Sequence, residues 1–549
     1  MPIHLHINET PADGPLGASL FEAAESIGVR VPTSCRKSGK CKECLVEVSE
    51  GMELLTPRGE EEAHLKDAFR LSCRCRVAAE SGVVRCHTMR RGQMRIESHS
   101  VELLGNRERL PLNPAVTRDG HRVLLDGEQI DSGEGPIYGI AMDLGTTTVV
   151  LRLIDLENGK VVADASFENP QRFGGSDVMS RIQYDTEQKG RVLQRALLGY
   201  LSHAIEEFPV DRQRIYEVVV AANSTMRDIL FGLDVYSIGQ NPYQSLSEIE
   251  MAQGKRSSTS LSTTAKQLRL PIHPKARVHG LPIVSGHVGA DAAACMLAVD
   301  FANEKRAVAL MDIGTNTELI VGNRGRLIAA SCPAGPAFEG GAIRFGMPGL
   351  PGAIEKVRLD DFGDEVESYS VIGDGEPVGI CGSGLISLLS ELLRTEKMNA
   401  LGRFEDEPEI ALAETDGERI VFTEGDVNEL AQAKGANVAG LRIAFKELGI
   451  RFEDLDMFYL AGGFGRHLDL EASKRIGLIP NLPDERIAQV GNAAVEGACI
   501  ALLSVDKRAE LEAMVKRVRH CRLEADAGFF DFFVEGCQFK PVQSEEAMC

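Results

Sequence analysis

Long apolar runs and the features of a secretory leader are missing from this sequence. Along its 549 residues, no uninterrupted hydrophobic stretch approaches the roughly 18 residues that a membrane-spanning helix needs. The first segment, MPIHLHINET, has neither a basic region nor an apolar core, so a cleaved signal peptide is not expected. These absences favour a cytoplasmic protein that does not bind membranes.

Positive charge is also in deficit. The formal net charge is -21, with 60 Lys and Arg against 81 Asp and Glu. Nucleic acids and anionic lipids attract clustered positive charge, so neither is an expected partner. The expected partners are proteins and small molecules. A chain of this length exceeds what one hydrophobic core usually organises, so several domains are expected.

Cysteines are present in number, but their distribution is uneven. The sequence has 13 of them, and the dense group lies before residue 90. The cytosol keeps thiols reduced, which favours ligands or buried thiols over disulfides. Only the dense group is expected to form a site, and it consists of Cys35, Cys41, Cys44, Cys73, Cys75 and Cys86.

The spacing of these cysteines predicts an iron–sulfur site. Within SCRKSGKCKEC, Cys35, Cys41 and Cys44 follow the pattern C-x5-C-x2-C, and Cys73 follows in RLSC. The plant-type 2Fe–2S pattern is C-x4-C-x2-C with a distant fourth cysteine, which is close to this one. A structural zinc site is the alternative, but it usually shows two CxxC pairs. Gly39 suits a loop whose backbone N–H groups approach a cluster.

The choice of the fourth ligand is less direct. Cys73 and Cys75 are expected on the same face of a strand over residues 70–77, because side chains repeat every two residues. Cys73 is preferred, while Cys75 and Cys86 are expected to be buried thiols. Basic residues near these cysteines predict a positive surface that steers an acidic electron donor. They are Arg36, Lys37, Lys40, Lys42, Arg70, Arg74 and Arg76.

The first 94 residues are expected to form a β-grasp-like module. IHLHI alternates as a strand does, and Ser19 is a helix N-cap before the apolar spacing of LFEAAESIGV. CLVEVSEG predicts a strand and GEEEAHLKD an acidic helix. Residues 95–136 are rich in charge and turn formers with weak periodicity, which predicts a linker.

Buried strands alternate with helices from Ile137 onward, and a second such half begins near residue 307. Each half contains one copy of a repeated segment, IAMDLGTTTVV and then ALMDIGTNTELIV. Each copy is predicted to be a β-hairpin whose turn points N–H and hydroxyl groups at phosphate oxygens. A single copy would pass for an ordinary hairpin turn, but repetition favours a phosphate-binding pair. Two lobes built on one plan are therefore expected.

The residues assigned to this pair follow from the turn chemistry. Asp143 and Asp312 end their strands and are the catalytic candidates, since each can hold Mg2+ directly or through water. The predicted ATP-binding residues are Gly145, Thr146 and Thr147 in the first turn and Gly314, Thr315, Asn316 and Thr317 in the second.

A third glycine-rich segment, YLAGGFGRHLD, follows a predicted strand. Gly462 and Gly463 would let an adenine ring approach the backbone, with Phe464 near the entrance. An ordinary strand-to-helix turn is the alternative. Segments 169–182, 332–343 and 380–385 are further glycine-rich candidates for lining a cleft. The P-loop signature is missing, which excludes that nucleotide-binding fold.

These motifs together resemble the reductive activators of corrinoid proteins. The resemblance rests on the cysteine loop and on AMDLGTTT, NPQRFGGSDVMSRI, GHVGADAAACML, MDIGTNTE, CPAGPAFEGGAI, GICGSGLI and LAGGFGRHLD, and covers nearly the whole chain. It implies a multidomain α+β and α/β protein, in which a ferredoxin domain is fused to a two-lobed ATPase domain like those of actin, Hsp70 and sugar kinases. The implied domains are 1–94 (ferredoxin), 95–136 (linker), 137–306 (first lobe) and 307–549 (second lobe).

The resemblance also implies a function. Such activators use ATP to reduce Co(II) corrinoid to Co(I) through the 2Fe–2S cluster, in support of a corrinoid-dependent methyltransferase or demethylase. The implied cofactors are the cluster held by Cys35, Cys41, Cys44 and Cys73, together with ATP and Mg2+. The implied partners are a corrinoid protein or methyltransferase, an electron donor such as a ferredoxin, flavodoxin or reductase, and a second copy in a homodimer.

Three alternatives stay open at this point. One is an ATP-dependent electron activator of another low-potential enzyme, such as a hydroxyacyl-CoA dehydratase. A second is a ferredoxin-fused kinase, for which no catalytic aspartate in a sugar pocket is evident. The third is a redox-sensing chaperone.

Overall fold

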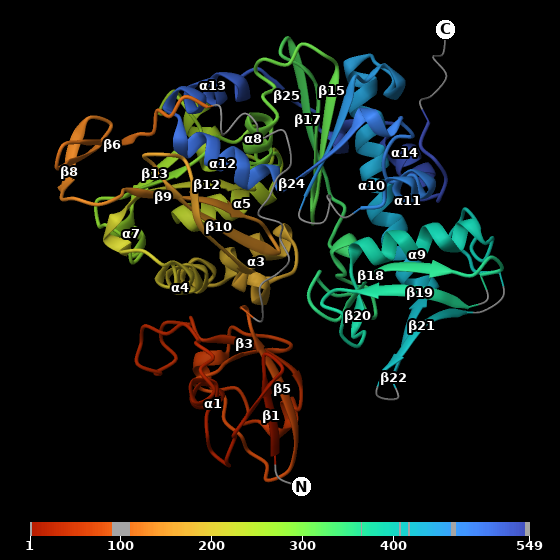
Figure 1. Cartoon of the computed structure of the whole chain (residues 1–549), viewed down its shortest axis with the longest axis horizontal. Coiled ribbons are helices and arrows are strands. Elements are labelled where there is room, and N and C mark those ends of the chain that lie inside the picture. The colour runs from red at the N-terminus through yellow and green to blue at the C-terminus, as the bar shows by residue number, and fades with distance from the viewer. Residues whose placement is uncertain are drawn as a thin grey trace. The chain divides into compact units, whose positions relative to one another are not determined.

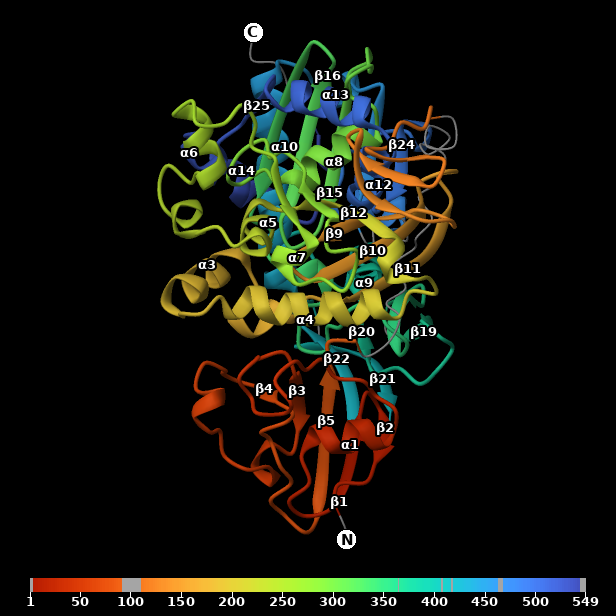
Figure 2. The same ribbon diagram turned by 90° about the vertical axis from the view of Figure 1, so that its left-hand side faces the viewer.

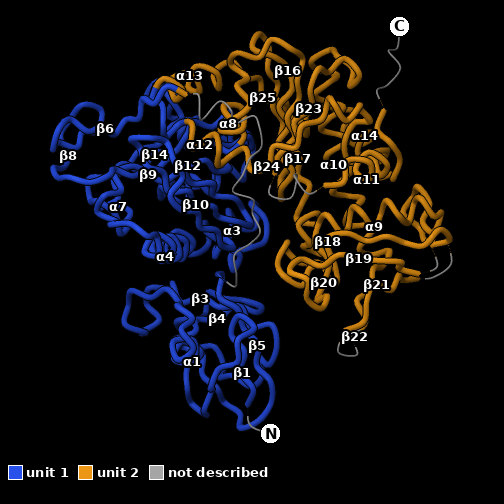
Figure 3. Tube along the Cα trace, viewed as in Figure 1, with its two compact units in different colours: residues 1–93, 111–291, 501–505 blue, residues 94–110, 292–500, 506–549 orange. Residues whose placement is uncertain are grey.

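The computed structural model describes most of the chain (Figure 1). It divides into two compact units, coloured separately in Figure 3. The first unit combines 1–93, 111–291 and 501–505, and the second combines 94–110, 292–500 and 506–549. The N-terminal module therefore belongs to the same unit as the first lobe. The described residues are 3–90, 110–363, 365–405, 408–415, 418–462 and 468–543.

The N-terminal module is a five-stranded sheet in the order β2-β1-β5-β3-β4, covered by α1 (Leu20–Ser26). Ser19 and Glu22 form the capping box that starts this helix, as its sequence predicts. The helix buries Leu20 and Phe21 in the module core. The β-grasp prediction is therefore confirmed. The strands are β1 (Ile3–Ile7), β2 (Thr10–Ala12), β3 (Leu45–Glu50), β4 (Phe69–Leu71) and β5 (Gly82–Thr88).

Two local predictions in this module are wrong. The acidic segment forms only a 3-10 turn over Glu60–Glu62, because the Glu62 side chain turns inward to a buried partner. The strand predicted over 70–77 ends at Leu71, whose carbonyl accepts hydrogen bonds from the N–H groups of Arg74 and Cys75 at 2.8 and 3.0 Å. Cys73 therefore lies in a turn.

Part of the expected linker is a small sheet. β6 (Val116–Asp119), β7 (Arg122–Leu125) and β8 (Glu128–Ser132) pair in antiparallel order. Asp-Gly pairs connect them, and Asp126 and Gly127 have φ values of 49° and 84°. Asp-Gly pairs are typical of tight hairpin turns. They were the sequence signal for this small sheet, although the hydrophobic periodicity of the segment is weak.

The first lobe is built on a six-stranded sheet in the order β11-β10-β9-β12-β14-β13. β12 (Ile215–Ala222) is buried along its whole length, as expected for a central strand. Figures 1 and 2 show α4 (Val192–Glu206) between this sheet and the N-terminal module. The other strands are β9 (Tyr138–Leu144), β10 (Thr148–Asp155), β11 (Val161–Glu168), β13 (Leu261–Thr264) and β14 (Arg277–Gly280). The other helices are α3 (Val178–Glu187), α5 (Ser224–Phe231), α6 (Leu246–Ala252) and α7 (Ala265–Leu268).

The second unit repeats this plan in the sheet β24-β23-β15-β16-β17-β25. In both sheets a hairpin pairs with a parallel third strand: β9 with β10 and β12, and β15 with β16 and β23. The predicted duplication of lobes is therefore confirmed. The strands are β15 (Val308–Ile313), β16 (Thr317–Asn323), β17 (Arg326–Cys332), β23 (Met457–Ala461), β24 (Ile487–Gly491) and β25 (Val518–His520).

A smaller sheet, β19-β18-β20, and a hairpin, β21-β22, are added to the second unit. Their bounds are β18 (Ala353–Leu359), β19 (Val366–Val371), β20 (Gly379–Ile380), β21 (Glu409–Thr415) and β22 (Glu418–Thr423). The helices are α8 (Ala290–Ala298), α9 (Gly382–Arg394), α10 (Glu424–Leu448), α11 (Leu470–Ile476), α12 (Ala493–Leu503), α13 (Val505–Val515) and α14 (Phe529–Gly536). In the described part of the chain, no helix combines the length and apolar character needed to cross a membrane.

Candidate cluster and nucleotide sites

The four predicted cluster ligands come together as two pairs. The thiol of Cys44 donates to Cys73 Sγ at 3.2 Å, and Cys35 and Cys41 form the second hydrogen-bonded pair. Cys41, Cys44 and Cys73 are buried, whereas Cys35 is partly exposed. A 2Fe–2S centre is held by four cysteine thiolates, so this donor set fits such a group.

Polar groups around the sulfurs favour the thiolate state in one member of each pair. Although burial opposes it, hydrogen bonds from Ser38 and Cys41 lower the pKa of Cys35 to about 6. The Cys44 thiol lowers the pKa of Cys73, to which the Gly39 N–H also donates. Gly39 has a φ of 76°, and an ideal Cβ there would lie 3.0 Å from the Arg74 side chain, so the backbone conformation and the close packing of the loop both favour glycine.

The remaining cysteines of the N-terminal group lie in the module core. Cys75 and Cys86 are almost completely buried, and burial raises the pKa of each thiol to about 12. These positions are those of inert buried thiols. In the described residues, no three His, Cys, Asp or Glu side chains surround one metal position.

The predicted basic surface is only partly present, because Arg70 is a core residue. Its guanidinium is 2% exposed and binds both carboxylate oxygens of buried Glu62, at 2.9 and 3.0 Å. Lys37 and Arg74 are paired with acidic neighbours, Glu25 and Glu61. Arg36 and Lys40 remain exposed. The exposed positive surface is therefore smaller than its residue count indicates.

The first-lobe turn is held by an asparagine from a neighbouring segment. Asp143 lies one residue before the end of β9, and the Gly145 N–H closes the turn on the Thr148 carbonyl at 2.9 Å. The Asn169 side-chain amide donates to the Gly145 carbonyl at 2.8 Å, and the Asn169 backbone N–H donates to the Thr147 carbonyl at 2.7 Å. Asn169 opens the segment 169–182, so part of that candidate segment reaches the turn.

A second asparagine, Asn223, was missed by sequence reasoning. It caps α5, and its amide donates to the Thr146 hydroxyl at 3.0 Å. Thr146 is only 6% exposed, so this bond fixes the hydroxyl beneath the turn. The sequence signal that could have found it is AANST, in which an asparagine stands between a buried strand and the start of a helix. A side chain at such a position lies beside the ends of the neighbouring strands.

The second-lobe turn brings Asp312 beside Gly462. An ideal Cβ at Gly462 would lie 3.2 Å from Asp312 Oδ1, and its φ is 113°. The Cys295 thiol donates to Asp312 Oδ2 at 3.4 Å. Burial raises the pKa of Asp312 to about 6, although the hydrogen bond from Cys295 acts to lower it. Gly463 and Phe464, the other predicted adenine contacts, lie outside the described residues.

Other residues of this turn differ in their surroundings. The Thr315 hydroxyl donates to Glu339 Oε2 at 2.6 Å. Thr317 is completely buried, so it lies beneath the turn surface. An ideal Cβ at Gly314 would have Asn316 O at 3.4 Å and Glu339 Oε1 at 3.9 Å as its neighbours, so no backbone atom blocks a small group there.

The two remaining candidate segments have different local roles. Residues 332–343 contain the turn Ala337–Glu339, which brings Glu339 to Thr315 of the second-lobe turn. Residues 380–385 start α9, where an ideal Cβ at Gly384 would lie 2.3 Å from the Ile354 carbonyl. This glycine therefore serves close packing of the helix on β18.

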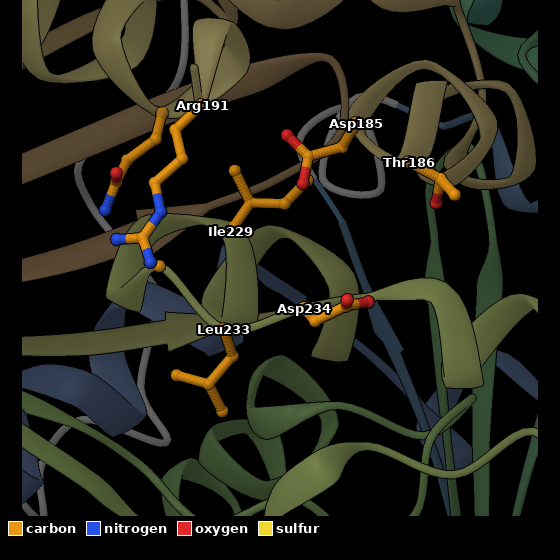
Figure 4. A pocket seen from close by; sticks show the side chains of 8 residues that line it. Asp185, Thr186, Arg191, Ile229, Leu233 and Asp234 are labelled. Atoms are coloured by element: carbon orange, nitrogen blue, oxygen red, sulfur yellow. The ribbon is translucent and has the colours of Figure 1, made fainter. Parts of the chain in front are cut away.

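A separate cavity of about 250 Å³ lies among α3, α4 and α5 of the first lobe (Figure 4). Asp185, Arg191 and Asp234 face it with Leu233 and Ile229. Burial and the nearby Asp234 raise the pKa of Asp185. None of the residues of the Gly145 turn lines this cavity.

Models of three protein families match this chain in succession. The 2Fe–2S iron–sulfur cluster binding domain matches residues 5–78, the RACo middle region matches 138–304, and the C-terminal domain of RACo, the ASKHA domain, matches 306–548. The ASKHA domain supports ATP as a ligand, and the first domain supports a 2Fe–2S cluster. The fold and sites thus define a ferredoxin-linked protein with an actin-like nucleotide-binding domain.

Three known proteins are similar to this chain over most of its length. The corrinoid activation enzyme RamQ of Eubacterium limosum is 27% identical, over 94% of this chain and 95% of its own. The Co(II) methylated amine-specific corrinoid protein reductase of Methanosarcina barkeri is 27% identical, over 72% and 76%. A solved reductive activator for corrinoid, iron-sulfur protein is 27% identical with a TM-score of 0.72, and the match covers 98% of both chains. This chain therefore matches the middle and C-terminal regions of RACo in succession, and it is similar to proteins named as activators or reductases of corrinoid proteins.

Proposed function

We propose that this protein uses ATP to reduce the Co(II) corrinoid of a partner protein to Co(I), and so returns the partner to methyl transfer. The observation that carries the proposal is the pairing of four cysteines in a ferredoxin module on a chain that also carries two phosphate-type turns. Relatives named as a corrinoid activation enzyme and as a reductive activator support it along nearly the full length.

The energetics explain why both sites share one chain. When bound, a plant-type 2Fe–2S cluster supplies one electron at roughly -400 mV. Reduction of Co(II) corrinoid needs a lower potential, and each 100 mV of mismatch costs about 2.3 kcal/mol per electron. ATP binding and hydrolysis provide the free energy for this uphill transfer.

We assign roles to residues on the geometry of each unit. Cys35 and Cys41 hold one side of the cluster, and Cys44 and Cys73 hold the other. Asp143 and Asp312 hold the Mg2+ that accompanies ATP, directly or through water. The phosphate contacts come from the turns at Gly145, Thr146 and Thr147 and at Gly314, Thr315 and Asn316, through backbone N–H groups where the hydroxyl is bound elsewhere. The adenine contacts come from Gly462, Gly463 and Phe464, whereas Thr317 is buried beneath the second turn.

The proposal extends to partners and surroundings. The corrinoid partner is a corrinoid protein or a corrinoid methyltransferase, and the electron comes from a ferredoxin, flavodoxin or reductase. The exposed Arg36 and Lys40 beside the cysteines favour an acidic donor. We also propose a homodimer that works in the cytoplasm, where thiols stay reduced.

The test combines the reconstituted full-length protein, a purified Co(II) corrinoid protein and a chemical reductant, with and without ATP. The expected result is Co(I) formation, seen by its absorption, only when ATP is present. Asp143→Ala and Asp312→Ala should each abolish that reduction while the cluster stays reducible. Co(I) formation at equal rates without ATP would contradict the proposal, and sugar phosphorylation by ATP would favour the kinase alternative.

A further inference from the structure

Glu339 lies directly against the second-lobe turn, although it is distant from that turn in sequence. It ends the 3-10 turn Ala337–Glu339 inside the segment CPAGPAFEGGAI. One carboxylate oxygen, Oε2, accepts the hydroxyl hydrogen of Thr315 at 2.6 Å. The other oxygen, Oε1, would lie 3.9 Å from an ideal Cβ on Gly314. The carboxylate is therefore placed beside the open side of the turn.

The bond from Thr315 changes the role expected for that threonine. Thr315 is 5% exposed, so its hydroxyl is fixed by the surrounding protein. A hydroxyl has one hydrogen, and here the hydrogen is directed at Glu339 rather than at a phosphate oxygen. Thr315 therefore positions the glutamate. A bond between a hydroxyl and an ionised carboxylate is short and strong, which suits a positioning role.

A carboxylate beside a turn that we assign to phosphate binding needs a chemical reason, because like charges repel. Accepting a proton from water is one such reason. Asp312 is placed differently: its Oδ2 accepts from the Cys295 thiol and its Oδ1 faces Gly462. Glu339 Oε1 lies on the Gly314 side, 3.9 Å from the position of an ideal Cβ, and so borders the turn to which we assign a phosphate.

We propose that Glu339 is the general base for ATP hydrolysis, an assignment that rests on the proposed use of ATP by this protein. A water oxygen attacks the γ-phosphorus and forms the new P–O bond. The bond between the γ-phosphorus and the bridging oxygen breaks, and its electron pair leaves with ADP. Glu339 takes a proton from the attacking water and later releases it to solvent. Thr315 is a positioning residue for this step.

The decisive variant is Glu339→Gln, because glutamine still accepts from Thr315 but does not take up a proton. ATP affinity should stay within about threefold, while single-turnover hydrolysis should slow by about 10²- to 10⁴-fold, the usual contribution of a general base. The dependence of the hydrolysis rate on pH should flatten on the acidic side. Glu339→Asp should recover part of the rate, and added Mg2+ should not restore Glu339→Gln.

Controls separate this assignment from the proposed function. Glu367→Gln removes an exposed carboxylate of β19 that pairs with Arg358, and it should leave hydrolysis unchanged. Thr315→Val should slow hydrolysis by roughly tenfold or more through misplacement of Glu339. Wild-type rates in Glu339→Gln, loss of ATP binding, or rescue by Mg2+ would each overturn the role of Glu339. A wild-type protein that neither binds nor hydrolyses ATP would instead overturn the proposed function.

Discussion

Replacing Tyr200 with phenylalanine is expected to weaken the contact between the N-terminal module and the first lobe. Tyr200 lies on α4, is 1% exposed, and donates to the Leu45 carbonyl at 2.8 Å, next to Cys44. The Met89 N–H donates to the same hydroxyl at 3.4 Å. Because Leu45 begins β3, this hydroxyl joins the strand that follows the cysteine loop to the first lobe.

The same contact continues toward the first-lobe turn. The Glu168 N–H donates to the Met89 carbonyl at 3.0 Å, and the adjacent Asn169 holds Gly145 and Thr147. Hydrogen bonds and one covalent step therefore connect the turn to β3 within a single compact unit. A continuous set of such contacts is a physical route by which two sites affect each other.

The magnitude follows from the groups left behind. Removing the hydroxyl takes a hydrogen-bond partner from the Leu45 carbonyl and from the Met89 N–H. A buried polar group that loses its partner lowers the stability of that region by about 1–3 kcal/mol. Local opening of β3 should then become about 5- to 150-fold more frequent, since 1.4 kcal/mol is a factor of ten. Hydrogen exchange of the β3 amides measures this opening directly.

The matched control is Tyr216→Phe. Tyr216 is equally buried in the same unit, but its hydroxyl bonds Asp131 at 2.7 Å, far along the chain from the cysteine loop. That variant should leave β3 exchange at the wild-type rate. ATP should alter β3 exchange in the wild type and do so less in Tyr200→Phe. Unchanged β3 exchange in Tyr200→Phe would refute the reasoning.

Three further predictions follow from single residues. Gly314→Ala should stay folded, because its Cβ would meet Asn316 O at 3.4 Å and Glu339 Oε1 at 3.9 Å, which are ordinary contact distances. ATP affinity measured by titration should fall roughly tenfold or more, and equal affinity would argue against phosphate at this turn. Glu62→Ala should destabilise the cluster module by about 3–5 kcal/mol, because Arg70 stays buried without its partner; a cluster absorption midpoint unchanged in urea would contradict this. Burial lowers the pKa of Lys434 to about 7 in the folded protein. Above pH 7 the unfolded chain therefore keeps a proton on Lys434 that the folded protein has lost, so the free energy of unfolding should rise from pH 7 toward 10. Lys434→Met should flatten this rise, measured by urea unfolding at several pH values.

Sequence reasoning reached those features whose signals are local. The spacing of Cys35, Cys41 and Cys44 lies on one short loop, and any fold that closes this loop brings the three thiols near each other. The repeated DLGTTT and DIGTNT segments are hairpins in the structure, because each joins two β-rich stretches by a turn. The helix capped by Ser19 is likewise determined within a few residues. The β-grasp module and the duplicated lobes could therefore be predicted.

The features that sequence reasoning missed depend on contacts between distant segments. Arg70 was expected to be exposed because arginine usually is, yet Glu62 and the Thr56 carbonyl satisfy its guanidinium in the core. Glu339 and Asn223 reach their turns only after separate segments pack, at 24 and 77 residues from their hydrogen-bond partners. A glutamate within CPAGPAFEGGAI carries no local sign of its partner, since a phosphate-binding turn is completed by whatever polar groups the fold places beside it. Residues that complete a site in this way are therefore found by geometry, and in this protein they include the residue that we assign as the general base.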